Sequence, residues 1–373
     1  MKNGWTTNRL GDVCEIIMGQ SPDGNSYNTT GKGVPLINGP VEFSEDSFGK
    51  TIRSKFTTQP TKFCKEGDLI LCVRGSTTGR MNIAGFYACI GRGVAAIRAK
   101  QYQPWVNHFI SSKRYEIHGK GTGATFPNIS GATLADFKLA MAPLPEQLRI
   151  VGILDEAFDG IATAKANAKK NLQNARALFE SHLQSVFTQR GEGWVEKTVD
   201  QISTNLDSKR IPITKSDRTS GEYPYYGASG IVDYVADYIF DGDTLLVSED
   251  GANLLARSTP IAFSVSGKYW VNNHAHILKF KSMATQRFVE FYLESIKLDE
   301  YITGAAQPKL NQKALNSIPI PIPKSTDAQA QIVESIESLF TETQHLESIY
   351  QRKLAALDAL KKSLLHQAFT GQL

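Results

Sequence analysis

Residues 146–188 read EQLRIVGILDEAFDGIATAKANAKKNLQNARALFESHLQSVFT, and this stretch decides the fold. It contains no proline, and its only glycines are Gly152 and Gly160. Apolar or small side chains recur at steps of mostly four and three residues, at Ile150, Leu154, Ala157, Ile161, Ala164, Ala168, Leu172, Ala175, Phe179, Leu183 and Val186. That spacing predicts one helix with a coiled-coil seam, about 60 Å long.

The same register returns near the end of the chain. It is carried by Ile332, Ile336, Leu339, Thr343, Leu346, Tyr350, Leu354, Leu357, Leu365 and Ala368, and Lys361 interrupts it. A helix with such a stripe is not stable alone in water, so each helix needs a partner. We expect the two helices to pair with each other, antiparallel. The alternative is that each is buried on its own globular domain.

The two helices belong to an internal repeat that covers most of the chain. The run GDLIL at 67–71 returns as GDTLL at 242–246. Further matches lie at offsets of 181 or 182 residues: 123–127 with 304–308, Ile150-Val151 with Ile332-Val333, and Phe187-Thr188 with Phe369-Thr370. We therefore divide the chain into a first domain at 1–145, a helix at 146–190, a second domain at 191–325 and a second helix at 326–373.

The globular parts have a different pattern. Short β-rich runs are separated by Gly, Asn, Ser and Thr clusters, at Asp68–Val73, Gly85–Ile90, Val94–Arg98, Thr244–Ser248 and His274–Phe280. Brief helices are predicted at about Trp105–Ile117 and Ala284–Ile296. The predicted fold class is α+β: two mostly antiparallel β-rich domains joined by two long antiparallel coiled-coil helices, related by a pseudo-two-fold. The Pro-rich segments Met141–Pro145 and Ile318–Lys324 are predicted to be stiff hinges.

Composition and length are those of an ordinary globular chain. It has 373 residues, of which 41% are hydrophobic and 21% charged. The longest apolar runs are too short for a membrane span, and the N-terminus lacks the apolar core of a signal peptide, so we expect a cytoplasmic protein. Cys14, Cys64, Cys72 and Cys89 form no CxxC pair. They are predicted to be reduced and packed, with a disulfide or zinc role as the alternative.

Charge is distributed unevenly. Residues 1–145 carry 17 Lys and Arg against 10 Asp and Glu, whereas residues 191–325 carry 14 against 16. A basic first domain is compatible with a polyanionic partner, but charge alone would not hold one tightly.

Sequence patterns for catalysis or cofactor binding are weak. There is no GxxxxGK[ST] loop and no [DN]PP[YFW] motif, and the GRGVAA run at 91–96 precedes strand-like residues rather than a helix. Asp136-Phe-Lys138 and Asp207-Ser-Lys209 lack the rest of a nuclease constellation. Gly227–Gly230 is predicted to be a turn rather than a nucleophile elbow. His274 and His276 would share one face of a strand, and satisfied strand histidines are preferred over a metal site. We predict a chain that is not an enzyme, without bound cofactor or metal.

Two polar loops follow corresponding strands of the two domains. The first holds Arg74, Ser76, Thr77, Thr78 and Arg80 with two glycines, which suits guanine and phosphate contacts. The second holds Ser248, Glu249, Asp250 and Asn253, with Arg257 beyond, and acids and amides suit cytosine and adenine. Two domains that recognise different DNA sequences would be expected to carry different side chains in equivalent loops. Taken singly, each loop is also compatible with a solvated turn.

Other DNA-binding candidates accompany these loops. They are Gln20, Ser21, Tyr27, Asn38 and Lys120 in the first domain, and Lys209, Arg210, Tyr225, Tyr226, Ser229, Lys268, Asn272, Asn273 and Lys309 in the second. Tyr225 and Tyr226 either stack on bases or pack internally, and Lys268 is also compatible with an exposed loop cation.

The chain resembles the specificity (S) subunits of type I restriction-modification systems over nearly its full length. The resemblance is carried by 67–71 with its Gly-Ser-Thr loop, WVNNHAH at 270–276, 123–128 followed by Pro145-Glu146-Gln147 and Ile150-Val151, and the ending KKSLLHQAFTG at 361–371. One departure is STDAQ at 325–329 in place of the first copy's Pro-Glu-Gln. We expect it to change the start of the second helix and not the architecture.

The resemblance implies two target-recognition domains that read a bipartite double-stranded DNA target in two half-sites, with the helices setting their spacing. It implies two methyltransferase subunits carrying S-adenosylmethionine, and further motor-nuclease subunits using ATP and Mg²⁺. No cofactor would reside on this chain, which would be the non-catalytic specificity subunit. The alternative is a coiled-coil interaction scaffold with terminal protein- or RNA-binding domains.

Overall fold

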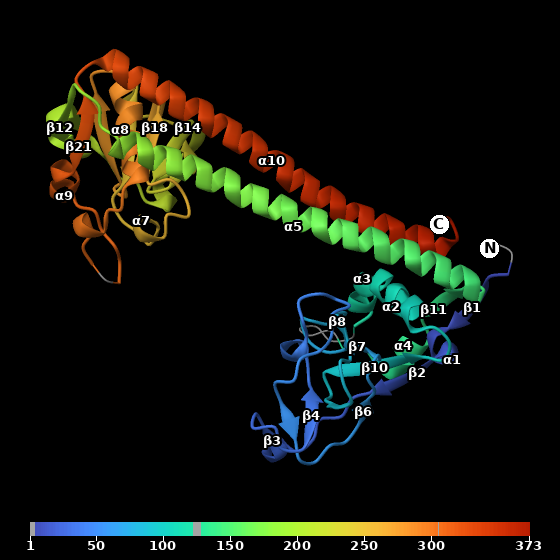
Figure 1. Ribbon diagram of the computed structural model, residues 1–373. Helices are drawn as coiled ribbons and strands as arrows, with labels where there is room; N and C mark the ends of the chain where they lie inside the picture. The colour runs from blue at the N-terminus through green and yellow to red at the C-terminus, as the bar shows by residue number, and fades with distance from the viewer. Residues whose placement is uncertain (1–3, 122–127, 305) are drawn as a thin grey trace. The chain divides into compact units, whose positions relative to one another are not determined.

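The computed structural model describes residues 4–121, 128–304 and 306–373 (Figure 1). The repeat motif predicted at 123–127 and residue 305 therefore lie outside the described residues. The chain forms two compact units, Met1–Ala168 with Arg352–Leu373, and Lys169–Gln351. No helix among the described residues has both the length and the apolar character needed to cross a membrane.

Both long helices are present as predicted, α5 at Leu144–Thr188 and α10 at Thr326–Thr370, with 45 residues each. In the first unit Lys165 pairs with Asp358, and Lys361 lies 4.6 Å from the Phe158 ring centroid. In the second unit Arg176 Nε lies 2.6 Å from Glu347 Oε1, and the rings of Phe179 and Phe340 are 5.3 Å apart. In each unit the residue numbers rise along one helix as they fall along the other, which confirms antiparallel pairing.

The predicted seam of α5 faces inward at every position, because all eleven residues are buried or half-buried. Leu346 on α10 is an exception, with 38% of its surface exposed. Lys361, which interrupts the seam in the sequence, is half-buried, and burial lowers the pKa of its amine. Its position over the Phe158 ring gives the charge a favourable cation–π contact there.

The first unit holds three sheets, with strand orders β2-β10-β7-β8, β3-β5-β4-β9-β6 and β1-β11. The strands are β1 Thr6–Arg9, β2 Cys14–Met18, β3 Tyr27–Asn28, β4 Val34–Ile37, β5 Phe56–Thr57, β6 Phe63–Cys64, β7 Leu69–Cys72, β8 Met81–Ile83, β9 Ala88–Ile90, β10 Val94–Ala99 and β11 Lys138–Met141. The short helices are α1 Leu10–Val13, α2 Gln103–Ser112, α3 Arg114–Gly119 and α4 Gly131–Ala135, with 3₁₀ turns η1 Gly24–Ser26 and η2 Pro40–Glu42.

The second unit also holds three sheets, with orders β13-β20-β17-β18, β15-β14-β19-β16 and β12-β21. The strands are β12 Trp194–Thr198, β13 Ser203–Asn205, β14 Ser220–Gly227, β15 Gly230–Val235, β16 Phe240–Asp241, β17 Thr244–Ser248, β18 Ala262–Val265, β19 Lys268–Val271, β20 Ala275–Phe280 and β21 Pro319–Pro323. The helices are α6 Val199–Ile202, α7 Asn253–Ala256, α8 Met283–Ser295 and α9 Gln312–Ser317, with 3₁₀ turns η3 Asp207–Lys209, η4 Lys215–Asp217 and η5 Asp299–Tyr301.

The sequence repeat is a repeat of topology. In each unit the central four-stranded sheet joins its strands in the equivalent order and is antiparallel throughout. Each unit also has one parallel pair, β4 with β9 and β14 with β19. The prediction of mostly antiparallel α+β domains is therefore confirmed. The sequence did not predict the two parallel strand pairs.

Each central sheet is buried on both faces. Leu69 and Leu71 of β7 pack into one apolar core, whereas Ile70 packs into another on the opposite face. In the second unit Leu245 and Leu246 of β17 divide in the same way. Successive strand residues point to opposite faces, so a strand covered on both sides needs an uninterrupted apolar run. This explains the GDLIL and GDTLL runs.

The prediction of a hinge at Ile318–Lys324 was wrong, because Pro319–Pro323 forms β21, paired antiparallel with β12. The backbone N–H of Val199 donates to Ile318 O, and that of Lys324 donates to Gly193 O. The even-numbered residues therefore bond to β12, and the prolines occupy the alternate positions, where no N–H is needed. Met141 likewise ends β11, and α5 begins three residues later.

The expected change at the start of the second helix is also absent. Helices α5 and α10 begin at positions 182 residues apart. The buried side-chain amide of Gln147 donates to Ala142 O at 2.8 Å, and that of Gln329 donates to Pro323 O at 2.7 Å. The same glutamine therefore anchors the first turn of both helices, and the loss of Pro-Glu before it does not move the helix start.

All four cysteines are buried free thiols. Burial raises the pKa of Cys14 and of Cys64 to about 12, so both are packed, protonated side chains at neutral pH.

Candidate nucleic-acid interface

The two predicted loops lie at equivalent edges of the two central sheets. The first follows β7, and Val73 N donates to Gly93 O of the β9–β10 turn. The second follows β17, and Glu249 N donates to His274 O of the β19–β20 turn. In each unit a backbone hydrogen bond therefore joins one loop and one turn at the same end of the sheet. This edge is the candidate interface.

In the first unit the interface is cationic. Arg74 and Ser76 are exposed, Thr77 and Arg80 are half-buried, and Thr78 is buried. The Thr78 hydroxyl donates to Gly75 O at 2.8 Å, which keeps it inside the loop. Gly75 and Gly79 have φ of 82° and 89°, in the left-handed region that favours glycine. Arg74 carries no ion pair within the described part of the chain, so its charge is available.

Sequence reasoning missed Arg92. It is exposed at the centre of the β9–β10 turn, and no ion pair to it occurs among the described residues. A Cβ on Gly91 would lie 2.0 Å from Asn38 Oδ1, so the chain can turn this tightly against Asn38 only with glycine. The GRG run was weighed only as a cofactor motif. An arginine between two glycines after a strand was the signal for an exposed turn.

Of the other first-unit candidates, Gln20, Ser21 and Asn38 lie beside that turn, whereas Lys120 and Tyr27 make other contacts. Gln20 N donates to Ile90 O, and the Ser21 hydroxyl accepts from Arg92 N at 3.3 Å. Asn38 is half-buried beside Gly91. Lys120 is paired with Glu116 at 3.1 Å and lies over the Phe137 ring. Tyr27 is half-buried, and its hydroxyl donates to Pro22 O at 3.2 Å.

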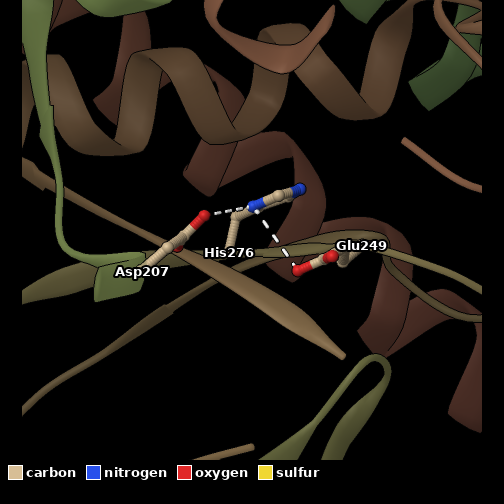
Figure 2. A group of neighbouring side chains, drawn as sticks. All are labelled: Asp207, Glu249 and His276. Carbon is tan, nitrogen blue, oxygen red and sulfur yellow. Dashed lines mark hydrogen bonds and ion pairs between the residues drawn. The ribbon is translucent and has the colours of Figure 1, made fainter. Parts of the chain in front are cut away.

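In the second unit the interface is a charge network. Figure 2 shows Asp207 and Glu249 on either side of His276, whose Nδ1 lies 2.5 Å from Asp207 Oδ2 and 3.8 Å from Glu249 Oε2. Arg210 Nη1 lies 2.7 Å from Glu249 Oε2, and Lys309 Nζ lies 3.2 Å from Glu249 Oε1. The fold thus brings three predicted DNA-binding candidates, Arg210, Glu249 and Lys309, into one network with Asp207 and His276, although these residues come from segments far apart in the sequence.

Charge pairing fixes the ionisation of this network. Burial alone would raise the pKa of Asp207, but the hydrogen bond and charge of His276 outweigh it and hold that pKa below its ordinary value. The pKa of Glu249 is also lowered, since Arg210, His276 and Lys309 outweigh its burial. Both carboxyl groups are therefore ionised at neutral pH.

Asp207, Glu249 and His276 place ligand atoms within 4.8 Å of one another, the spacing of a metal site. Their ligand atoms are already engaged, however. Nε2 of His276 lies 2.7 Å from Leu310 O, and Arg210 and Lys309 bind Glu249. Arg210, Lys309 and His276 thus already contact the two carboxylates, and a divalent cation bound there would lie close to the positive charges of Arg210 and Lys309. The contacts in the structure are those of an ion-pair network.

The prediction that His274 and His276 share a strand face was wrong. Asn272, Asn273 and His274 form the turn before β20, and Asn272 Oδ1 accepts from His274 N at 2.8 Å. His274 is exposed and its Nδ1 lies 2.9 Å from Asp250 Oδ2, whereas His276 is 1% exposed.

Other second-unit candidates are held in internal contacts. Tyr225 and Ser248 are each 1% exposed and Asn272 is 8% exposed. The Asn253 amide closes its own loop through Thr259. Arg257, with φ of 50°, donates to Leu293 O and Ile296 O at the end of α8, and burial lowers its pKa. These side chains therefore make packing and capping contacts inside the unit. They do not present the exposed surface that base recognition requires.

The remaining second-unit candidates reach the surface. Lys209, Ser229, Asn273 and Lys309 are exposed. Ser229 lies at the tip of the β14–β15 hairpin, where Ile231, Val232 and Tyr234 are also exposed. Lys268 lies 4.5 Å from the Tyr238 ring centroid, and Tyr226 is half-buried beside Phe263 and Tyr269.

The fold and the two edges define a binding protein of two related α+β units, each presenting a loop and a turn of different chemistry. The chain belongs to the family of the type I restriction modification DNA specificity domain, which it matches at residues 2–174 and again at 191–353. The repeat seen in sequence and topology is thus two copies of one family domain.

Known relatives have the same description. The chain is 36% identical over 143 residues to a protein described as a type I restriction enzyme specificity subunit from Haemophilus influenzae, covering 38% of this chain and 36% of that protein. It is 33% identical over 177 residues to one described as the MjaX specificity subunit from Methanocaldococcus jannaschii, covering 46% and 40%. The matches span about two fifths of the length of these curated relatives.

Solved structures share the fold. A chain from work on complex assembly and conformational transition of the type I R-M system has a TM-score of 0.81 at 16% identity, covering 100% of this chain and 99% of that one. The HsdS subunit from Thermoanaerobacter tengcongensis has a TM-score of 0.63 at 17% identity, covering 100% and 98%. At these identities the likeness is one of fold.

Proposed function

We propose that this chain is the DNA-specificity subunit of a type I restriction-modification complex. Each unit reads one half of a bipartite double-stranded DNA target, and paired helices connect the two readers. The chain is non-catalytic, and it directs enzymatic subunits to the target.

The observation that carries the proposal is the equivalence of the two edges. Both units place a loop and a turn at the same end of the same sheet, yet one edge offers Arg74 and Arg92 and the other offers Lys309, His274 and Asn273. A common scaffold with different side chains is suited to two different base sequences. Arginine pairs bidentately with guanine, and amides suit adenine.

The residue roles follow from exposure. Arg74, Ser76 and Arg92 would contact bases or phosphates in the first half-site, with Gln20, Ser21 and Asn38 positioned beside them. In the second, Lys209, Ser229, Asn273 and Lys309 would make the direct contacts, and the buried network would hold Lys309 in place through Glu249.

The proposed partners supply the chemistry. Two methyltransferase subunits would bring S-adenosylmethionine and methylate adenine, which they reach by flipping the base out of the duplex. Motor-nuclease subunits would bring ATP and Mg²⁺ and cleave unmodified DNA. No cofactor is assigned to this chain.

Methylation mapping tests the proposal. The chain is co-expressed with the methyltransferase subunit of its own system in a methylation-free host, and N6-methyladenine is located by sequencing. We expect a split motif with a fixed non-specific gap. A continuous motif would limit DNA reading to one unit, and an unmethylated genome despite a stoichiometric complex would overturn the proposal.

A further inference from the structure

A cavity of about 800 Å³ lies in the second unit, away from the candidate interface. It is bounded by β12 and β21, by the end of β20 and by the first turns of α8 and α10; Figure 1 shows β12, β21, α8 and the start of α10 close together. The described residues that line it include four lysines and neither aspartate nor glutamate.

The four lysines are Lys197 on β12, Lys279 and Lys281 at the end of β20, and Lys324 directly after β21. All four are exposed, and none forms an ion pair with another residue in the described ranges. Four exposed lysines around one concave site, with no acidic side chain in its described lining, give the site a local excess of positive charge. Such a site attracts an anionic occupant.

Part of the cavity lining is apolar. Val195, Ile202 and Phe280 are half-buried and Ile322 is buried, and they line the cavity together with uncharged polar residues. A phosphodiester backbone brings charge but no apolar side chain to cover these residues. A protein segment with a large apolar side chain flanked by carboxylates brings both.

The cavity also lies at the wrong end of the sheet for DNA reading. Strand β20 begins at Ala275, beside Ser248 and the charge network, and ends at Phe280, which lines the cavity. Five residue steps along a strand cover about 17 Å. A duplex lying against the loop and turn would therefore leave the cavity free for another macromolecule.

The first unit has a smaller counterpart of about 220 Å³, lined by Val13, Ala99, Lys100 and Met141. Here Lys100 Nζ donates to Asp12 O at 2.8 Å, and Asp12 itself lines the site. The described lining holds one lysine and one aspartate, so the excess positive charge of the second unit is absent. Both units therefore have a cavity at this position, but only the cavity of the second unit is strongly cationic.

We propose that the cavity of the second unit is a docking site for an acidic protein segment with an apolar side chain, contributed by a methyltransferase subunit. The inference rests on the proposed function, because it takes the partner from it. Two copies of the methyltransferase subunit would then bind two cavities that differ in size and charge. The copy on the second unit would be bound more tightly.

The test uses the full chain with the methyltransferase subunit of its own system. The dissociation constant is measured by calorimetry for wild type, for K281E/K324E, and for K215E/K313E, a control pair of exposed lysines in the same unit outside this cavity. We expect at least a tenfold weaker complex for K281E/K324E and less than a twofold change for the control. Zero-length carbodiimide crosslinking of the wild-type complex should join Lys279, Lys281 or Lys324 to carboxylates of one methyltransferase segment.

An unchanged dissociation constant together with an absence of such crosslinks would overturn the inference. Subunit affinity that is intact in K281E/K324E, with a DNA-binding salt slope reduced by about two, would assign the cavity to DNA phosphates instead. Methylation mapping of the wild-type complex distinguishes failure of the docking site from failure of the proposed function. A split motif with an unaffected K281E/K324E complex defeats only the docking site, whereas an absent motif defeats the proposed function.

Discussion

Asp207 Oδ2 lies 2.5 Å from His276 Nδ1, and the two residues are 9% and 1% exposed. His276 Nε2 lies 2.7 Å from the carbonyl oxygen of Leu310, which can only accept. Both ring nitrogens of His276 therefore face oxygen atoms within hydrogen-bond distance. Asp207 Oδ1 also accepts from Ile277 N at 2.8 Å. The pair thus joins η3, β20 and the segment before α9 beneath the candidate interface.

Replacing Asp207 should destabilise the second unit. Asp207→Asn removes the carboxylate that faces the buried His276 ring, and breaking a buried pair on one side costs about 3 kcal/mol. Urea denaturation followed by tryptophan fluorescence measures the loss. The control is Asp233→Asn, which breaks a more exposed pair, Arg218 Nη1 to Asp233 Oδ2 at 3.0 Å, and should destabilise the unit clearly less, because solvent screens that pair. Equal losses in the two variants would contradict this account.

The same network predicts a pH dependence. The pKa values of Asp207 and Glu249 are lowered in the folded state, so their contribution to stability is complete above the unfolded values of about 4. It is lost as the pH falls through the folded-state values. The free energy of unfolding should therefore differ between wild type and Asp207→Asn at pH 7, and the difference should shrink below about pH 4. A gap that stays constant from pH 7 to pH 3 would show that Asp207 ionisation contributes nothing.

Local periodicity predicted the helices, the repeat and the central strands, because those features depend on spacing within one segment. Ile150 and Ile336 are buried where the seam places them. The strand at Pro319–Pro323 was missed because proline signals a break unless its missing N–H points away from the partner strand. That depends on β12, more than 120 residues away.

Polar residues were predicted less well, since their roles depend on contacts between distant segments. Arg210 and Glu249 are 39 residues apart and each was predicted as a DNA contact, but they bind each other. Ser248 has the composition of a loop residue, yet its hydroxyl donates to Ala228 O and it is buried. Arg92 was overlooked because the tight turn that exposes it is fixed by Asn38.

Arg257 should contribute to stability and not to sequence recognition. Its guanidinium donates to Ile296 O at 2.8 Å and Leu293 O at 3.3 Å, capping the end of α8. Arg257→Gln should lower the free energy of unfolding by about 2 kcal/mol, the value of hydrogen bonds from a charged donor. The methylated motif should be unchanged. A changed motif with unchanged stability would instead assign Arg257 to DNA contact.

Packing of the helix seam can be tested within α10. Ile336 is fully buried and Ile349 is 37% exposed, so the pair compares one side chain in two environments. Ile336→Ala should cost about 2–5 kcal/mol through lost burial and the cavity left behind. Ile349→Ala should cost well under half of that. Chemical denaturation of both variants measures the difference, and similar costs would mean that the seam does not carry the packing.

Replacing Arg74 or Arg92 should affect one half-site only. Arg74 and Arg92 are exposed at one edge of the first unit, and neither has an ion pair among the described residues. Losing a bidentate guanine contact costs about 1–3 kcal/mol, so Arg74→Gln or Arg92→Gln should reduce methylation about 5- to 150-fold or relax one base position. The second half-site should stay as specific as in wild type. Arg9→Gln is the control, an exposed arginine on β1 that pairs with Asp136 and lies outside this edge. A uniform loss over both half-sites would instead identify phosphate contacts, with the salt slope reduced by about one for each arginine.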